Sequence, residues 1–347
     1  MKKIIFAACA AAVALASVSC NKNLSAPSIP VEGDGSPINV EVKIGPSTRV
    51  TGITDNDVTT EAKVNTLQVF VFNNDALDGY ATSTAKTATV SCSAGLRDIW
   101  AVVNAPDLSA ITSKAALLAT VSTLSEEISN FQMIGSKTET LKFDGSVMIN
   151  VDRLAARVVV KGIKNAIKNA AQANAFKLLG IYLTNITGDV NYGLSTDYSV
   201  TKWYNQRGYQ AANNLGSFSY DAIDATLAAD ATHDTAHYFY TYPNHYDAKT
   251  GGPWSGRAAR IVIKAEIAGV VFDYPILLPE IENNKSYEIK VVNITRAGNL
   301  DDGKEPTDGT PDDKDEEEEV IGIDQDIEII VNDWTTVLVG EEGEKTI

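Results

Sequence analysis

The stretch INVEVKIGPSTRV, residues 38–50, determines how the rest of the chain is interpreted. Its first seven residues alternate between apolar and polar side chains, which is the period of a β-strand with one buried face. The apolar members are Ile38, Val40, Val42 and Ile44. A Gly-Pro-Ser-Thr break then leads to Arg49 in a loop, where a protease can reach it. The fold is therefore predicted to begin with a strand that can be cut from its own domain.

Cleavage between Arg49 and Val50 would separate this strand from the rest of the fold. Four buried apolar side chains at roughly 1.5–3 kcal/mol each amount to about 6–12 kcal/mol, comparable to the stability of a whole domain. Loss of the strand would also leave unpaired backbone donors and acceptors along a groove. Such a groove favours the capture of another strand with the same period.

The charge of the chain is concentrated in one place. The 347 residues carry a formal charge of −16, which argues against nucleic acid as a partner. Residues 301–319 contain eleven Asp and Glu against two Lys, so this tract alone contributes −9. It does not contain the Asp-x-Asp-x-Asp-Gly pattern of a calcium loop, and we expect a solvated acidic loop that binds no metal.

The first 20 residues form an export leader. Lys2 and Lys3 precede an apolar run over residues 4–18, and small residues precede Cys20. This order predicts a lipoprotein signal in which Cys20 takes palmitate-type acyl chains, although an ordinary signal peptide with a coincidental cysteine is the alternative. The polar residues 21–37 would then form a tether, and the precursor would touch the membrane only through its lipid.

The remainder of the chain alternates short apolar strands with turns. About twelve to fourteen strands are expected, with one or two helices, of which residues 108–124 are the best candidate. This spacing predicts a mainly β fold of sandwiches or barrels. We expect a propeptide over residues 21–49, a first domain over 50–155, and a second domain over 156–347 that includes the acidic loop.

Several segments in this order resemble the type V pilins, the major fimbrial subunits of Bacteroidia, over nearly the full length. They are the leader ending at Cys20, the segment of residues 31–50, VSCSAGLRDIWAVVNAP, VDRLAARVVV, YFYTYPN, NNKSYEIKVVNIT and VNDWTTVLVG. The resemblance implies two β-sandwich domains of the transthyretin-like type. It also implies an outer-membrane lipoprotein precursor that an arginine-specific protease cuts after Arg49, releasing the first strand.

The resemblance further implies that the C-terminal strand of a neighbouring subunit fills the groove. In this chain that donor strand would contain Ile329, Val331, Trp334, Val337 and Val339. A groove at one end and a donor at the other give a head-to-tail contact that does not close, hence a filament. The expected partners are other copies of the chain, the arginine-specific protease, and the anchor and tip subunits of a cell-surface fimbrium that supports adhesion.

Other interpretations of the chain, as an enzyme, a metalloprotein or a glycan-binding protein, have weaker support in the sequence. No nucleophile motif or phosphate loop stands out, and we expect neither an enzyme nor a cofactor. His233 and His237 lie four residues apart, but on a single strand this spacing brings ligands together poorly, so no metal site is expected. An accessory or tip subunit remains an alternative. A monomeric glycan-binding surface lipoprotein is the other, and it would use exposed aromatic residues such as Trp203, Tyr204, Tyr246 and Trp254.

Overall fold

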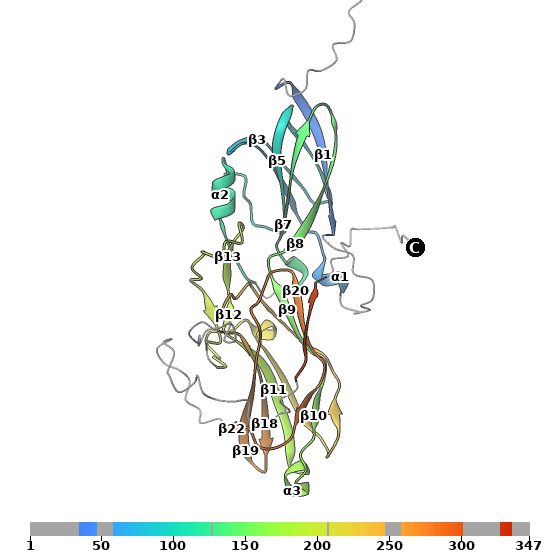
Figure 1. Ribbon diagram of the computed structural model, residues 1–347, viewed down its shortest axis with the longest axis vertical. Helices are drawn as coiled ribbons and strands as arrows, with labels where there is room; N and C mark the ends of the chain where they lie inside the picture. The colour runs from blue at the N-terminus through green and yellow to red at the C-terminus, as the bar shows by residue number, and fades with distance from the viewer. Residues whose placement is uncertain are drawn as a thin grey trace, which may run out of the picture.

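The computed structural model describes residues 35–46, 58–125, 128–206, 208–246, 258–300 and 327–334. The molecule is long and narrow, with the N-terminal strands at one end and most C-terminal strands at the other (Figure 1). The described residues form 23 strands and only short helices, α1 (Val58–Glu61), α2 (Lys114–Ala119) and α3 (Ala170–Ala173). The predicted mainly β fold is therefore confirmed. None of the helices in this described part has the length and apolar character needed to span a bilayer.

The N-terminal end is a curled seven-stranded sheet with the order β3-β2-β5-β7-β8-β1-β4. Its outermost strands β3 and β4 contact each other, and a Cβ on Gly79 of β3 would lie only 2.4 Å from the carbonyl oxygen of Ser91 on β4. Close packing at this point therefore requires glycine. The strands are β1 (Pro37–Pro46), β2 (Leu67–Asn73), β3 (Ala76–Ser83), β4 (Thr87–Ser93), β5 (Gly95–Val103), β7 (Met133–Leu141) and β8 (Gly145–Arg153).

The described part of the C-terminal end contains three further sheets of three or more strands, with orders β15-β11-β18-β19-β22, β17-β9-β20-β23 and β16-β10-β21. One apolar cluster runs through them and continues into the N-terminal half, since it includes Phe70 of β2 and Val102 of β5. The boundary predicted at residues 155 and 156 stays a prediction. The strands are β9 (Ala156–Val160), β10 (Ile163–Asn165), β11 (Phe176–Thr184), β15 (Tyr220–Thr226), β16 (Thr232–His233), β17 (His237–Thr241), β18 (Arg260–Ile267), β19 (Val270–Leu277), β20 (Lys285–Ile289), β21 (Val292–Ile294), β22 (Asn299–Leu300) and β23 (Ile329–Asp333).

The prediction of a helix over residues 108–124 was wrong about its length. Only α2 is helical, and it begins after Ser113, whose hydroxyl accepts a hydrogen bond from the Ala116 amide at 3.1 Å. Thr120 is extended, and the next residues form β6 (Val121–Thr123), which pairs with β13 (Asp189–Asn191). The β-branched residues of β6 favour this pairing over another helical turn.

Candidate functional site

The first strand lies between two neighbours and joins them. β1 runs antiparallel to β4 and parallel to β8, and among the described strands β4 has no other hydrogen-bonded partner in this sheet. Withdrawal of β1 would therefore open the sheet between β4 and β8 and expose two strand edges. The strand predicted over residues 38–44 is present and extends from Pro37 to Pro46.

The inward face of β1 is apolar and closely packed. Ile38 lies opposite Cys92, Val40 opposite Val90 and Val42 opposite Ala88 on β4. On β8, Val42 lies opposite Val147 and Ile44 opposite Ile149. These pairs belong to the core of the N-terminal sheet. The four apolar side chains of β1 are between 0% and 6% exposed, as the alternation predicts.

The outward face of β1 is polar and only loosely attached. The side-chain oxygen of Asn39 accepts a hydrogen bond from the Ser91 hydroxyl at 2.6 Å, and the backbone N–H of Asn39 donates to the Asp144 carboxylate at 2.7 Å. Lys43 pairs with Glu41 of the same strand at 2.9 Å, so this ion pair does not tie β1 to its neighbours. The strand is therefore held by backbone pairing and by burial of its apolar face.

Cys92 lies under β1 at 6% exposure, and it is a free thiol. Burial raises the pKa of this thiol to about 11, with the Asp78 carboxylate contributing in the same direction. The thiol is therefore almost entirely protonated at neutral pH and poorly nucleophilic while β1 is in place.

The predicted processing and lipidation residues lie outside the described part of the chain. These are Cys20, Arg49 and Val50. The last residue of β1, Pro46, stands three positions before Arg49. The acidic tract over residues 301–319 also lies outside the described residues.

The predicted donor residues fall into two groups. Ile329 and Val331 belong to β23, which pairs antiparallel with β20, and Trp334 directly follows β23 and is 2% exposed. Val337 and Val339 lie outside the described residues. The first group already has partners within its own chain. Among these, Trp334 contacts Arg153 and also Glu61, a residue that the sequence did not single out.

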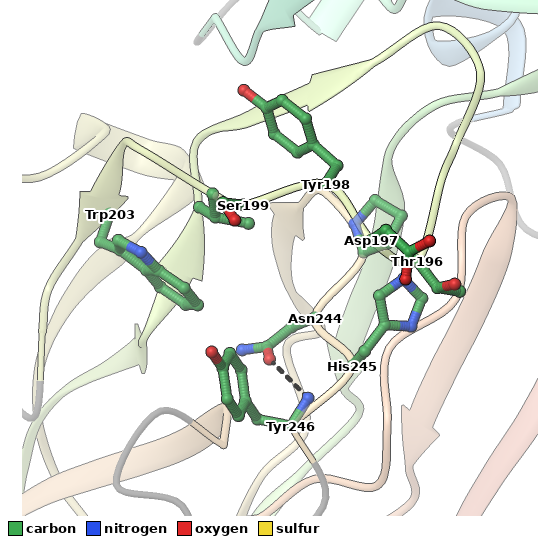
Figure 2. Close-up of a pocket in the computed structure, with 10 residues that line it drawn as sticks. Thr196, Asp197, Tyr198, Ser199, Trp203, Asn244, His245 and Tyr246 are labelled. Carbon is green, nitrogen blue, oxygen red and sulfur yellow. Dashed lines mark hydrogen bonds between the residues drawn. The ribbon is translucent and has the colours of Figure 1, made fainter.

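Figure 2 shows a pocket lined by residues 196–200, Trp203 and residues 243–246. Its volume is about 530 Å³. The rings of Trp203 and Tyr246 face it with centroids 6.0 Å apart, and Asn244 holds the Tyr246 amide at 3.1 Å. Trp203 and Tyr204 form β14 (Trp203–Tyr204) and are largely buried, whereas Tyr246 is 44% exposed. Two of the four aromatic residues of the glycan-binding alternative therefore line one pocket, and Trp254 lies outside the described residues.

His237 begins β17, as the strand predicted from this residue requires, and His233 lies on β16. The expectation that this spacing keeps the two side chains apart was wrong, since the residues between the strands bring the Nε2 atoms to 3.0 Å with stacked rings. His237 Nδ1 contacts the Asp221 carboxylate at 2.6 Å. In the described part of the chain, no group of three or more metal-ligating side chains occurs.

Comparisons with known proteins agree with this architecture. The family model of the major fimbrial subunit protein (FimA) matches residues 37–171, beginning at the first residue of β1. No curated protein sequence matches the chain. A proposed cell adhesion protein from Bacteroides eggerthii has a similar structure, with a TM-score of 0.61, 18% identity, and coverage of 88% of this chain and 98% of that one.

Two solved fimbrial proteins from Porphyromonas gingivalis are also similar in fold. A fimbrilin has a TM-score of 0.52 at 18% identity and covers 76% of this chain and 91% of its own. The tip fimbrial protein Mfa3 has a TM-score of 0.53 at 13% identity, covering 86% and 100%. The matched family is one of structural subunits and not of enzymes. The predicted resemblance is confirmed: residues 37–171 match the FimA family of major fimbrial subunits, and the chain has a fimbrilin-like fold.

Proposed function

We propose that this chain is the precursor of a stalk subunit of cell-surface fimbriae. It is exported as a lipoprotein anchored through Cys20, cut between Arg49 and Val50, and assembled by strand exchange. The observation that carries this proposal is the position of β1, which bridges β8 and β4, buries its whole apolar face, and ends three residues before Arg49. The family match to residues 37–171 supports the fimbrial role.

The energetics of the groove favour exchange over simple loss of the strand. Burial of four apolar side chains is worth about 6–12 kcal/mol, so an empty groove is strongly destabilised. A neighbouring subunit that supplies an alternating apolar strand restores most of this burial together with the backbone pairing. Its C-terminal segment is the proposed donor, which makes the contact head-to-tail and the assembly a filament.

A disulfide across the first strand tests this mechanism. Ile38 lies directly opposite Cys92 in an antiparallel pair, where Cα atoms are close enough for a disulfide. In the Ile38→Cys variant of residues 21–347, oxidation should tie β1 to β4 through the native thiol. Cleavage after Arg49 by an arginine-specific protease should then give no filaments until a reductant is added.

The matched control is Val40→Cys, which lies opposite Val90 and so has no cysteine partner. Its filaments should form with or without reductant. Filament growth by the oxidised Ile38→Cys protein, with the bond shown intact by mass spectrometry, would contradict the proposed release of β1.

A monomeric glycan-binding protein is the second candidate, favoured by the pocket that holds Trp203 and Tyr246. Aromatic faces beside polar groups suit the apolar and hydroxyl faces of a sugar. This function predicts that uncleaved monomer binds a soluble polysaccharide and that Tyr246→Ala abolishes binding. A tip or accessory subunit is a variant of the first proposal, and it would cap filaments instead of extending them.

A further inference from the structure

A buried polar cluster joins the helix after the predicted cleavage loop to the end of the chain's last described strand. Glu61 of α1 is 1% exposed. Its Oε2 accepts from Arg157 Nη1 at 3.0 Å and from Trp334 Nε1 at 3.1 Å, and its Oε1 accepts from the Tyr240 hydroxyl at 2.7 Å. Figure 1 shows the red strand of the C-terminal end finishing beside α1. The Glu61 carboxylate therefore holds Trp334 by its indole N–H.

Arg153 closes the same cluster from the other side. Its Nε donates to the Glu61 carbonyl oxygen at 3.1 Å and its Nη1 donates to the Trp334 carbonyl oxygen at 3.2 Å. Its guanidinium carbon lies 4.2 Å from the centroid of the Trp334 ring. Burial lowers the pKa of Arg153 to about 10, so the side chain stays charged at neutral pH. The Trp334 amide also donates to the Asn284 carbonyl oxygen at 2.8 Å.

This clamp differs in kind from the attachment of β1. β1 is held by apolar burial and backbone pairing, both of which another strand can reproduce. Withdrawal of Trp334 would instead leave the buried Glu61, Arg153 and Arg157 with fewer partners, which is costly in a protein interior. β23 is also fastened to β20 by an ion pair of 2.6 Å between Lys285 and Asp333. The C-terminal end of β23 is therefore a poor candidate for release.

We propose that Glu61 is a positioning residue for strand donation: it pins Trp334 in its own subunit, so that β23 stays paired with β20 and the donated segment begins after Trp334. The inference rests on the proposed strand exchange and narrows its donor to residues 335–347. These 13 residues can span roughly 43 Å when extended, whereas the ten residues of β1 span roughly 33 Å. Glu61 follows Val50, so the clamp remains on the cleaved subunit.

A single exchange event tests where donation begins. The acceptor is a chain ending at Trp334 and cut after Arg49, which has a groove but no donor segment. The donor is an Arg49→Ala precursor that keeps β1 and therefore cannot accept. In the donor, Lys285→Cys and Asp333→Cys replace the surface ion pair by a disulfide between β20 and β23, in a Cys92→Ala background.

The oxidised donor, in which the disulfide locks β23 to β20, should form a one-to-one dimer with the acceptor. This dimer should form as fast as it does with the reduced, unlocked donor. A dimer that forms only after reduction would show that β23 must leave, and would overturn the inference while leaving strand exchange intact. If the unlocked donor gives no dimer either, strand exchange itself is overturned, and the inference with it.

Hydrogen exchange tests the role of Glu61 itself. Trp334→Phe keeps an aromatic ring in the core but removes the N–H that Glu61 accepts. Loss of a hydrogen bond to a charged group should speed amide exchange in β23 at least tenfold. Exchange in β11 should not change, and Tyr287→Phe, which removes a hydroxyl that bonds backbone groups away from Glu61, serves as the control. Unchanged exchange in β23 of the Trp334→Phe protein would overturn the proposed pinning.

Discussion

Truncation of a buried side chain in the first strand should weaken the precursor but not the filament. Val42 is fully buried and lies opposite Ala88 on β4 and Val147 on β8. Val42→Ala removes two methyl groups at about 0.8 kcal/mol each, and the cavity left behind raises the total loss to about 2–3 kcal/mol. If β1 leaves the subunit on assembly, as we propose, the stability of the filament should not change.

The assay compares two unfolding midpoints in urea for each variant. The Val42→Ala precursor should unfold at lower urea than wild type, by an amount that corresponds to about 2–3 kcal/mol. Filaments assembled from the same variant should dissociate at the wild-type midpoint.

The control substitution lies in a strand that the subunit keeps. Val90→Ala on β4 removes the same two methyl groups at an equally buried position, and it should weaken precursor and filament alike. Equal weakening of the filament by Val42→Ala would refute the argument, because β1 would then still be present after assembly.

Three further predictions follow from the geometry around the groove and the histidine pair. Cys92 should react with iodoacetamide at pH 8 about 100-fold faster in a cleaved subunit whose groove holds no strand than in the precursor. The reason is that loss of burial returns the pKa of the thiol from about 11 towards 9.0. Equal rates would contradict exposure of the groove. A peptide of residues 36–46 added in excess during cleavage should block filament growth, and a peptide with aspartate at positions 40 and 42 should not. Burial, and to a smaller extent the neighbouring His237, lowers the pKa of His233 in the folded state. The neutral His233 side chain therefore contributes its full share of stability above the ordinary pKa of 6.5, and this share is lost as the pH falls below 6.5. His233→Gln should reduce the loss of stability seen in denaturation midpoints between pH 7.5 and 5, whereas His245→Gln should not.

The strands that could be predicted are those with a clear alternating or continuous apolar pattern. β1 and β11 were located from their own residues, and the hairpin of β18 and β19 from Gly269, which adopts a φ of 85°. β7 was missed because its central residues are polar and exposed, and β3 because a glycine interrupts it. In both strands the neighbouring strands, and not the local residues, decide the conformation.

The burial of one face of β1 could be predicted from the sequence, but the contacts of Trp334 could not. The alternation of β1 specifies which side chains are buried, whichever strands lie beside them. Glu61 and Trp334 are 273 residues apart, and nothing in the local sequence of either indicates that they meet. The histidine pair is similar, since the irregular segment between β16 and β17 brings the rings together where one continuous strand would separate them.

The most direct test of strand release and exchange is to cut the protein of residues 21–347 with an arginine-specific protease and to analyse the products by mass spectrometry. Release of β1 followed by strand exchange predicts a new N-terminus at Val50, filaments in which residues 37–46 are missing, and a ladder of polymers that grows with concentration. A protein that is cut after Arg49 but stays monomeric with residues 37–46 still bound would contradict it.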